Sequence, residues 1–303
     1  MGAFLACDWG TTHLRAWVVE AGGAVRAART FPIGVARLQP GEAPARLRDE
    51  VRPTLGAEAL PAVLCGMIGS NLGWTQVPYL DCPVDATAFG AALHPAPDSD
   101  PPAWIAPGLR GPGPTAAPDV MRGEETQVFG WLAQDPARAR GRHLLCMPGT
   151  HAKWVLVEDG AIVRFVTAMT GELFDILSRH SVLRNAASAD DGTTFAKGVE
   201  AAGDGGGLAA RLFSARSRVV GAGAPAAETA SYLSGLLIGA EVAAVPRLMK
   251  STPTAPIVLI GEPSLCGWYS KAIEQAGLTA ITYDGDEAAL AGLVALNAYR
   301  IAL

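Results

Sequence analysis

Short apolar runs and alternating stretches follow one another along the first part of the chain. Residues 3–8 form an apolar run that predicts a buried strand, and the alternation at residues 13–19 predicts a second strand. The turn Ala21-Gly22-Gly23 comes next, after which residues 24–29 fit a third strand. The apolar spacing over residues 43–52 is typical of a helix. The chain is therefore expected to begin as three consecutive strands followed by a helix.

The rest of the chain alternates predicted strands with predicted helices. Strands are expected at Pro61–Cys65, His143–Met147, Trp154–Glu158, Ile162–Thr167 and Ile257–Ile260, and helices at Gly123–Ala133, 171–183, 228–250 and 286–300. A glycine-rich loop, Gly66–Gly73, follows the first of these strands, and Asp159-Gly160 forms the turn of a hairpin. Because strands and helices alternate, we predict an α/β fold.

A proline-rich segment interrupts this pattern at residues 95–118. It has little periodicity, so we expect a long loop or crossover there and place a domain boundary at its end. The resulting lobes are residues 1–118 and residues 119–285. We expect the C-terminal helix, residues 286–303, to join the first lobe.

The chain contains an internal similarity. When residues 143–165 are laid over residues 4–26, Cys146 falls on Cys7, Gly149 on Gly10 and Thr150 on Thr11. Both copies have an apolar strand, a Gly-Thr turn, an alternating strand, a tight turn and a further strand. This shared pattern predicts two related lobes that face each other.

Composition and charge narrow the class of protein. Half of the 303 residues are hydrophobic and 17% are charged, so a sizeable core is expected. The net charge of -5 argues against nucleic acid and anionic membranes as partners. No run of 18 uncharged apolar residues occurs, and we expect a cytoplasmic protein. The five cysteines are scattered, which argues against a zinc site or a disulfide framework.

The two Gly-Thr turns are candidate phosphate sites. A glycine lets the backbone approach a ligand closely, and the N–H groups and threonine hydroxyls of such a turn can hold phosphate oxygens. Asp8, at the end of the first strand, would then hold Mg²⁺. The alternative is an ordinary β-turn in which Asp8 accepts backbone N–H groups. No GxxxxGK[ST] motif is present, so this is not a P-loop enzyme.

Several motifs carry a family resemblance. DWGTTHLRAW, MPGTHAKW and LIGEPSL resemble the two phosphate motifs and the adenosine motif of the actin-like, hexokinase-like ATPase superfamily, in the same order. GMIGSNLGW, VMRGEETQ, PGTHAKW and MTGELF together resemble the 2-dehydro-3-deoxygalactonokinase family. The resemblance implies two related actin-like (ribonuclease H-like) lobes with an ATP cleft between them. It also implies phosphorylation of 2-dehydro-3-deoxy-D-galactonate at its terminal C6 hydroxyl, with ATP and Mg²⁺.

The resemblance assigns residues to the nucleotide and the metal. Asp8 would be the metal carboxylate, and the residues at the phosphates and the adenosine would be Gly10, Thr11, Thr12, Gly149, Thr150, His151, Lys153, Gly261 and Glu262. Lys153 has a solvated strand position as its alternative. The adenosine motif has a single glycine before Glu262 where the superfamily has a pair, so it departs from the wider pattern.

A catalytic carboxylate is expected just before the second phosphate turn. Glu124 and Glu125 lie in that place and start a predicted helix. Adjacent helical positions point about 100° apart, so one carboxylate would face the sugar hydroxyl while the other caps the helix. The alternative is that both acids are only helix-terminal residues.

The substrate of this family is an anion with several hydroxyls. Carboxylates are bound by arginine and by backbone N–H groups, so the candidate substrate residues are Arg15, Ser70, Asn71, Arg122, Thr170 and Glu172. Arg15 has a solvated strand face as its alternative, and Thr170 and Glu172 have helix capping as theirs.

Two other activities remain open. A phosphoanhydride hydrolase of the exopolyphosphatase type would use the same turns with water as the acceptor. A kinase for 2-dehydro-3-deoxy-D-gluconate would differ only in the stereochemistry of the sugar acid. A homodimer is common among such enzymes.

Overall fold

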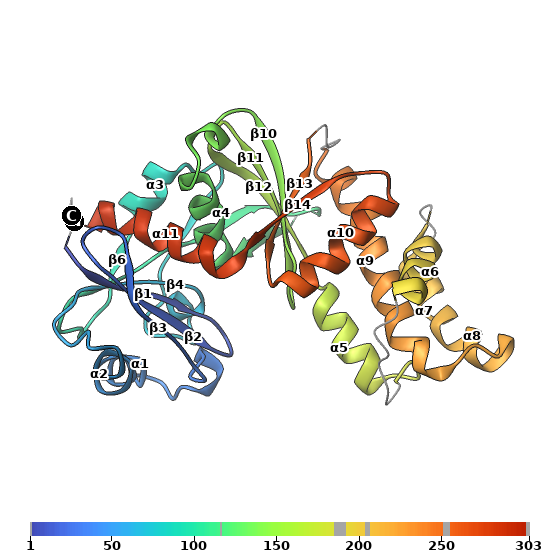
Figure 1. Ribbon diagram of the computed structural model, residues 1–303, viewed down its shortest axis with the longest axis horizontal. Coiled ribbons are helices and arrows are strands. Elements are labelled where there is room, and N and C mark those ends of the chain that lie inside the picture. Colours follow the sequence, from blue (N-terminus) through green and yellow to red (C-terminus); the bar gives the residue numbers. More distant parts are fainter. Residues whose placement is uncertain (1, 116, 185–191, 204–206, 251–254, 301–303) are drawn as a thin grey trace. The chain divides into compact units, whose positions relative to one another are not determined.

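The computed structural model describes residues 2–115, 117–184, 192–203, 207–250 and 255–300 (Figure 1). The chain divides into two compact units. Unit 1 consists of Met1–Arg142, Val157–Arg164 and Gly285–Leu303, and unit 2 consists of His143–Leu156 and Phe165–Asp284. The α/β prediction is confirmed, because both units combine sheets with helices.

The first unit extends well past the boundary expected at residue 118. The helix α4 (Glu124–Ala133) packs so closely on the C-terminal helix α11 (Gly285–Arg300) that a Cβ atom on Gly130 would lie 1.9 Å from the Ala288 carbonyl oxygen. This packing keeps α4 in unit 1, together with α11. Residues 301–303, the end of the expected C-terminal segment, lie outside the described residues.

The proline-rich segment is not the structureless loop that was expected. It contains β7 (Ala103–Ile105) and β8 (Gly108–Pro112), and it is flanked by β6 (His94–Pro95) and β9 (Pro118–Met121). The strands are short, and their prolines lie at strand ends, where a missing N–H costs least. Pro112 pairs with Pro118 at the end of the β8–β9 ladder. The prolines therefore end strands here and do not separate two domains.

Unit 1 is built on a six-stranded sheet in the order β3-β2-β1-β4-β7-β6. The three predicted N-terminal strands are confirmed as β1 (Phe4–Trp9), β2 (Leu14–Val19) and β3 (Val25–Phe31), which pair antiparallel. The strand β4 (Ala62–Cys65) pairs parallel with β1. A smaller sheet has the order β5-β8-β9, where β5 is Tyr79–Asp81. The helix α3 (Ala86–Ala91) also belongs to this unit.

Alternate residues of β1 point to opposite faces of this sheet. Leu5, Cys7 and Trp9 enter the core that is closed by α1 (Ala43–Arg46), a π-helical turn η2 (Leu47–Val51) and α2 (Arg52–Leu55). Asp8 therefore points to the other face, where α11 lies (Figure 1).

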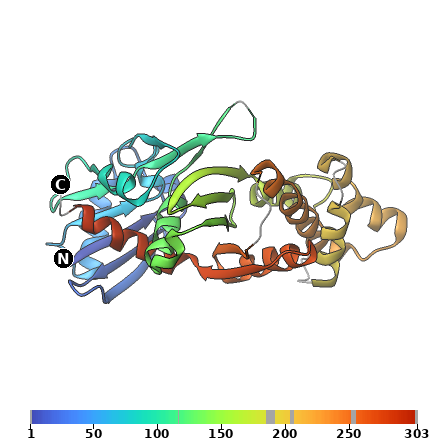
Figure 2. The ribbon, with the colours of Figure 1, turned by 90° about the horizontal axis from the view of Figure 1, so that it is seen from above.

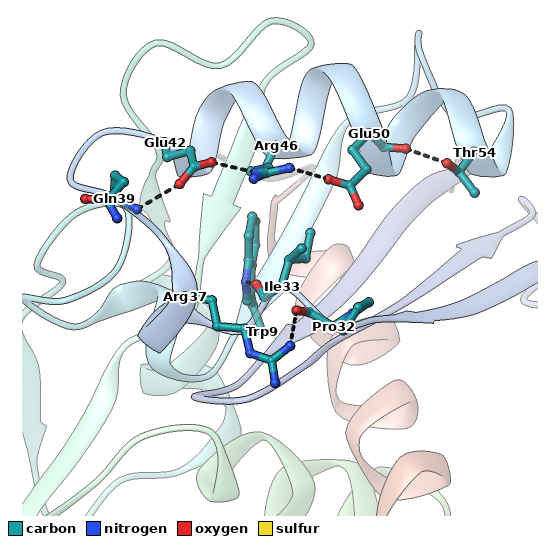
Figure 3. A network of polar contacts seen from close by, with 9 residues as sticks. All are labelled: Trp9, Pro32, Ile33, Arg37, Gln39, Glu42, Arg46, Glu50 and Thr54. Atoms are coloured by element: carbon teal, nitrogen blue, oxygen red, sulfur yellow. Dashed lines mark hydrogen bonds and ion pairs between the residues drawn. The ribbon is translucent and has the colours of Figure 1, made fainter.

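The helical segment from 43 to 55 carries ion pairs on its outer surface and a buried arginine on its inner surface. On the outside, Arg46 pairs with both Glu42 and Glu50, one turn away on either side (Figure 3). On the inside, Arg52 is buried and donates to the backbone carbonyls of Leu60 and Pro101. The Trp9 indole N–H donates to the Ile33 carbonyl at 2.7 Å, which ties the end of β1 to the chain after β3; both residues are drawn in Figure 3.

A further sheet has five strands in the order β12-β11-β10-β13-β14. Most of it belongs to unit 2, while Arg142, residues 157–158 and residues 161–164 are counted with unit 1. The strands of this sheet are β10 (Arg142–Met147), β11 (Ala152–Glu158), β12 (Ala161–Ala168), β13 (Ile257–Gly261) and β14 (Ala280–Asp284). The order β12-β11-β10-β13 repeats the order β3-β2-β1-β4 of the other unit. The duplication expected from the sequence is therefore present in the sheets. The strand β14 was not predicted.

The helices of unit 2 surround one long apolar helix, α9 (Thr229–Leu248) (Figures 1 and 2). The others are α5 (Thr170–His180), α6 (Gly192–Ala202), α7 (Leu208–Leu212), α8 (Ser214–Ala222) and α10 (Pro263–Gln275). Residues 226–248 are long and apolar enough to cross a bilayer, but 78% of the most apolar stretch is buried within the structure. A Cβ atom on Gly235 would lie 2.0 Å from the Phe195 carbonyl oxygen, so α9 is a core helix packed tightly on α6.

Candidate functional site

The first Gly-Thr turn presents its N–H groups on one side. The carbonyls of Gly10, Thr11 and Thr12 accept hydrogen bonds of 3.0, 3.1 and 3.1 Å from the backbone of residues 34–36. The C=O and N–H of a trans peptide point in opposite directions, so the N–H groups of Thr11, Thr12 and His13 are turned away from that segment. They have no acceptor within the described part of the chain, and all three residues are exposed. The turn can therefore receive an anion.

The second Gly-Thr turn is supported differently. The Thr150 carbonyl accepts the Glu172 N–H at 2.9 Å, and the His151 ring pairs with the Glu172 carboxylate. Lys153 is buried, and its ammonium donates to the His151 carbonyl at 3.0 Å. Lys153 therefore supports the turn from within, and its expected phosphate contact stays a prediction.

Asp8 lies in a cluster of charged side chains in unit 1. Arg15, its cross-strand neighbour, pairs with Asp8 and with Asp286 in the first turn of α11. Burial raises the pKa of Asp8, while the Arg15 charge lowers it, and the charges of Asp286 and Glu124 raise it again. Asp286 was not among the expected site residues, and its only signal in the sequence was its place at the start of the predicted last helix.

Glu124 and Glu125 have different environments. Glu125 is fully buried, and both of its carboxylate oxygens accept the Gly123 N–H at 2.8 Å. Burial raises the pKa of Glu125 to about 8, with the neighbouring Glu124 charge adding to the shift. Glu124 is partly exposed at the first position of α4. Glu125 therefore caps the helix, while Glu124 is the carboxylate within reach of solvent.

Glycines bring these carboxylates close to Asp8. Gly123 has φ 116°, and a Cβ atom built on it would lie 3.3 Å from the Gly66 Cα atom. Gly66 follows β4, and a Cβ atom there would lie 3.1 Å from the Asp8 Oδ1 atom. Asp8, the end of β4 and the start of α4 therefore lie so close together that no side chain fits between them at Gly66 and Gly123.

The loop after β4 holds two expected substrate residues. Ser70 is buried and shapes the loop, because its hydroxyl donates to the Met67 carbonyl at 2.7 Å and accepts the Leu72 N–H at 3.2 Å. Asn71 is exposed at the tip of the loop. Of these two expected substrate residues, Asn71 is the one that is exposed.

Arg122 lies beneath the same loop. Its Nη2 atom donates to the Val77 carbonyl at 2.7 Å, and its guanidinium stacks on the Tyr79 ring at 4.4 Å. Its Nε and Nη1 atoms are buried and have no hydrogen-bond partner among the described residues. A buried donor without an acceptor is costly, so Arg122 can still take up an anionic group.

Unit 2 contains a cavity of about 810 Å³ beside the second Gly-Thr turn. Gly149 and Thr150 lie at its edge, and Phe195, Trp268 and Tyr269 give it aromatic walls. The charged residues that line it are the acids Glu172, Asp175 and Glu262. The cavity therefore suits a flat, uncharged ring with hydroxyl groups better than it suits the phosphates themselves.

Glu262 and two of the expected substrate residues, Thr170 and Glu172, belong to this cavity. Glu262 follows Gly261 and caps α10 by accepting the N–H groups of Ser264 and Leu265 at 3.0 and 2.9 Å. Thr170 and Glu172 line the same cavity. Thr170 and Glu172 thus lie in the cavity beside the second Gly-Thr turn, and the sugar contact predicted for them stays a prediction.

One buried acid in unit 2 was missed by sequence reasoning. Glu241 accepts the Trp154 indole N–H at 2.6 Å and the Tyr269 hydroxyl at 2.9 Å, and Thr170 also donates to it. Burial raises the pKa of Glu241. Tyr269 and Thr170 both line the cavity, so Glu241 fixes part of its wall from behind. A lone glutamate inside the apolar run of α9 was its signal in the sequence.

No group of three or more His, Cys, Asp or Glu side chains in the described ranges gathers to hold a metal ion by itself. Mg²⁺ in nucleotide sites usually has one or two carboxylates, with phosphates and water as its other ligands. The Asp8 cluster offers such a carboxylate.

Known proteins resemble this chain over almost its whole length. The sequence profile of 2-keto-3-deoxy-galactonokinase matches residues 8–296. The probable 2-dehydro-3-deoxygalactonokinase DgoK1 of Rhizobium meliloti (strain 1021) is 37% identical, covering 97% of this chain and 96% of its own. The 2-dehydro-3-deoxygalactonokinase of Escherichia coli (strain K12) is 36% identical, covering 96% of each chain.

Solved structures also resemble this chain over almost its whole length. The crystal structure of a Sinorhizobium meliloti protein assigned to 2-dehydro-3-deoxygalactonokinase has a TM-score of 0.88 and 34% identity, covering 99% of this chain and 100% of its own. The activator of the 2-hydroxyisocaproyl-CoA dehydratase from Clostridium difficile, solved with bound ADPNP, has a TM-score of 0.50 at 13% identity, covering 99% of this chain and 96% of its own. The second likeness concerns the fold alone.

Proposed function

Since the chain belongs to the 2-keto-3-deoxy-galactonokinase family, we propose that it is an ATP-dependent sugar-acid kinase that phosphorylates 2-dehydro-3-deoxy-D-galactonate at its C6 hydroxyl. The observation that carries this proposal is the first Gly-Thr turn, where three N–H groups without acceptors within the described part of the chain lie next to the buried carboxylate of Asp8. The second turn borders a cavity that suits an adenosine group.

The residues around Asp8 fit a magnesium ion. Asp8, Asp286 and Glu124 bring several carboxylates against the single guanidinium of Arg15. This excess of negative charge favours a divalent cation, and carboxylate oxygens are the donors that Mg²⁺ prefers. We assign Asp8 as the residue that holds it. When bound, the ion would neutralise phosphate charge.

Glu124 is the proposed catalytic carboxylate. Its partial exposure and its nearness to Asp8 support this role, whereas both oxygens of Glu125 already accept the Gly123 N–H. Glu124 accepts the proton of the C6 hydroxyl as that oxygen bonds to the γ-phosphorus, and the bond from phosphorus to the ADP oxygen breaks. Phosphoryl transfer depends mostly on positioning, so Glu124 chiefly orients the hydroxyl.

The sugar acid would be bound in unit 1. Arg122 and the exposed Asn71 are the candidates that the geometry supports, since Arg122 keeps two donors without an acceptor among the described residues. Arg15 is already paired with two carboxylates, and Ser70 shapes its own loop. We therefore assign Arg15 to the metal cluster and Ser70 to loop support. Since the proposed substrates are ATP and a small metabolite, we propose that the enzyme acts in the cytoplasm.

Product analysis tests the proposal. The protein is incubated with ATP, Mg²⁺ and 2-dehydro-3-deoxy-D-galactonate, and the products are identified by ³¹P and ¹³C NMR. We expect ADP and a phosphate ester whose coupling lies on C6. Inorganic phosphate as the only new phosphorus species would contradict a kinase and indicate a phosphoanhydride hydrolase. Faster conversion of the gluconate-derived acid would move the proposal to that epimer.

A further inference from the structure

Each Gly-Thr turn rests on a glycine that follows the third strand of its repeat. Gly34 comes after β3, which ends at Phe31, and Gly171 comes at the same interval after β12, which ends at Ala168. The two glycines thus hold equivalent places in the duplicated frame. Neither was expected from the sequence to act on the nucleotide turns.

The contact leaves no room for any side chain at Gly34. A Cβ atom there would lie 2.2 Å from the Thr12 carbonyl carbon and 2.3 Å from the Thr11 carbonyl oxygen. Gly34 has φ −61°, which any residue can adopt. Close approach to the turn is therefore the reason for a glycine at this position, and backbone conformation is not.

Gly171 has the same relation to the second turn. A Cβ atom on Gly171 would lie 2.4 Å from the Gly149 carbonyl oxygen and 2.8 Å from the Thr150 Cα atom. The next residue, Glu172, donates its N–H to the Thr150 carbonyl at 2.9 Å. In both repeats, backbone packed without a side chain lies directly against the turn.

We propose that Gly34 and Gly171 are positioning residues. Each one holds its Gly-Thr turn in the shape that binds phosphate oxygens of the nucleotide. By lying flat on the turn, each glycine lets the following residues reach the turn's carbonyls. Those hydrogen bonds direct the N–H groups of the turn to the opposite side, where phosphate oxygens bind. The atoms nearest to a Cβ built on either glycine belong to the backbone of the turn, so each glycine acts through the turn, although Gly171 also lines the cavity beside the second turn. This inference rests on the proposed kinase function.

The first experiment compares ADP with adenosine on Gly171→Ala by isothermal titration calorimetry. The two ligands share the base and the ribose, so their ratio of affinities reports the phosphate contacts. We expect ADP affinity to fall about 10-fold or more, because misplacing the N–H donors of the turn weakens their hydrogen bonds to the phosphates by about that factor. Adenosine affinity should stay within about twofold of the wild type. Gly221→Ala is the matched control, since a Cβ atom there meets nothing within 4 Å.

The second experiment measures turnover of Gly34→Ala at saturating ATP and sugar acid. We expect kcat to fall at least about 10-fold with adenosine affinity unchanged. Gly22→Ala is the control, because a Cβ atom at Gly22 also meets nothing within 4 Å. Equal losses for adenosine and ADP, or no loss in either glycine variant, would overturn the positioning role.

A second variant covers the case in which Gly34→Ala does not fold. Ala36→Pro, at an exposed residue, removes the N–H that donates to the Thr11 carbonyl and puts the proline Cδ atom in its place, while Ala36→Ser keeps that N–H. Ala36→Pro should lower kcat more than Ala36→Ser does, and equal kcat values would contradict the proposal. If the wild type bound ADP no more tightly than adenosine, the kinase assignment itself would be at fault.

Discussion

The two repeats share a frame but differ in charge at the end of their first strands. In the first repeat, β1 ends in Asp8, a buried carboxylate paired with Arg15. In the second, the equivalent residue of β10 is Met147, which is buried and apolar. The first turn accordingly lies beside a cluster of charges, while the second lies beside an apolar cavity of about 810 Å³. The comparison teaches that the duplicated fold supplies two similar turns, one beside a cluster of charges and the other beside an aromatic-walled cavity.

The largest expected effect comes from removing the charge that distinguishes the repeats. Asp8→Asn keeps the size of the side chain but loses the metal carboxylate. We expect kcat/KM to fall at least about 10³-fold, since a metal ion contributes several kcal/mol of charge stabilisation. Steady-state kinetics across a range of Mg²⁺ concentrations measures this. Met147→Leu, at the equivalent place in the second repeat, should change kcat/KM little, and equal effects of the two variants would contradict the division.

A smaller effect separates the two glutamates at the start of α4. Glu124→Gln should lower kcat about 10²-fold, at the lower end for a general base because positioning dominates phosphoryl transfer. Glu125→Gln should lower kcat much less, because Glu125 caps the helix through Gly123. The pair of variants is compared at saturating substrates. A larger loss for Glu125→Gln would reverse the assignment.

The buried groups of the two units sharpen the comparison further. Glu241→Gln places an amide against the Trp154 and Tyr269 donors, which should raise the KM for ATP several-fold and lower the free energy of unfolding by about 1–3 kcal/mol. Arg52→Met removes donors to backbone carbonyls in unit 1. It should lower stability by a similar amount and leave the KM for ATP unchanged. A shifted KM in Arg52→Met would show that KM reports general damage.

The last expected effect leaves turnover aside and is a dependence of stability on pH. The pKa of Glu125 is raised to about 8 in the folded protein, from 4.5 in the unfolded chain. Between these values the folded state binds more protons, so this group makes the free energy of unfolding fall as pH rises from about 5 to about 8. Glu125→Gln should remove that slope, amounting to a few kcal/mol at most. Chemical denaturation at several pH values tests it, and parallel profiles for both proteins would be the contrary result.

Much of the frame could be predicted from the sequence, because apolar periodicity reports burial. The strands β1, β2, β10 and β11 were predicted to within a few residues, and the duplication was visible at Gly10 and Gly149. The strand β14 was missed because it has no buried residue, which hides the period. The helices α6 to α8 were missed as well. The helices α7 and α8 are short and bury at most one residue each, so they show no apolar stripe.

The candidate site was predictable only where a motif is local. Asp8 and the turn residues follow one another in the sequence, so their grouping was evident. The pairing of Arg15 with Asp286 joins residues far apart in the chain, and no local pattern indicates it. No local pattern indicates the role of Gly34 either, because that role depends on the backbone that packs against it. The choice between Glu124 and Glu125 required burial, which adjacent positions do not reveal.

The most direct test of the central claim is the release of ADP with different acceptors. ATP and Mg²⁺ are supplied with 2-dehydro-3-deoxy-D-galactonate, with 2-dehydro-3-deoxy-D-gluconate, with simple hexoses or with water alone, and ADP is measured by a coupled assay. A sugar-acid kinase releases ADP when a keto-deoxy acid is present, fastest with the galactonate-derived acid, and hardly any with hexoses or water. Release at the same rate with water alone would contradict the account.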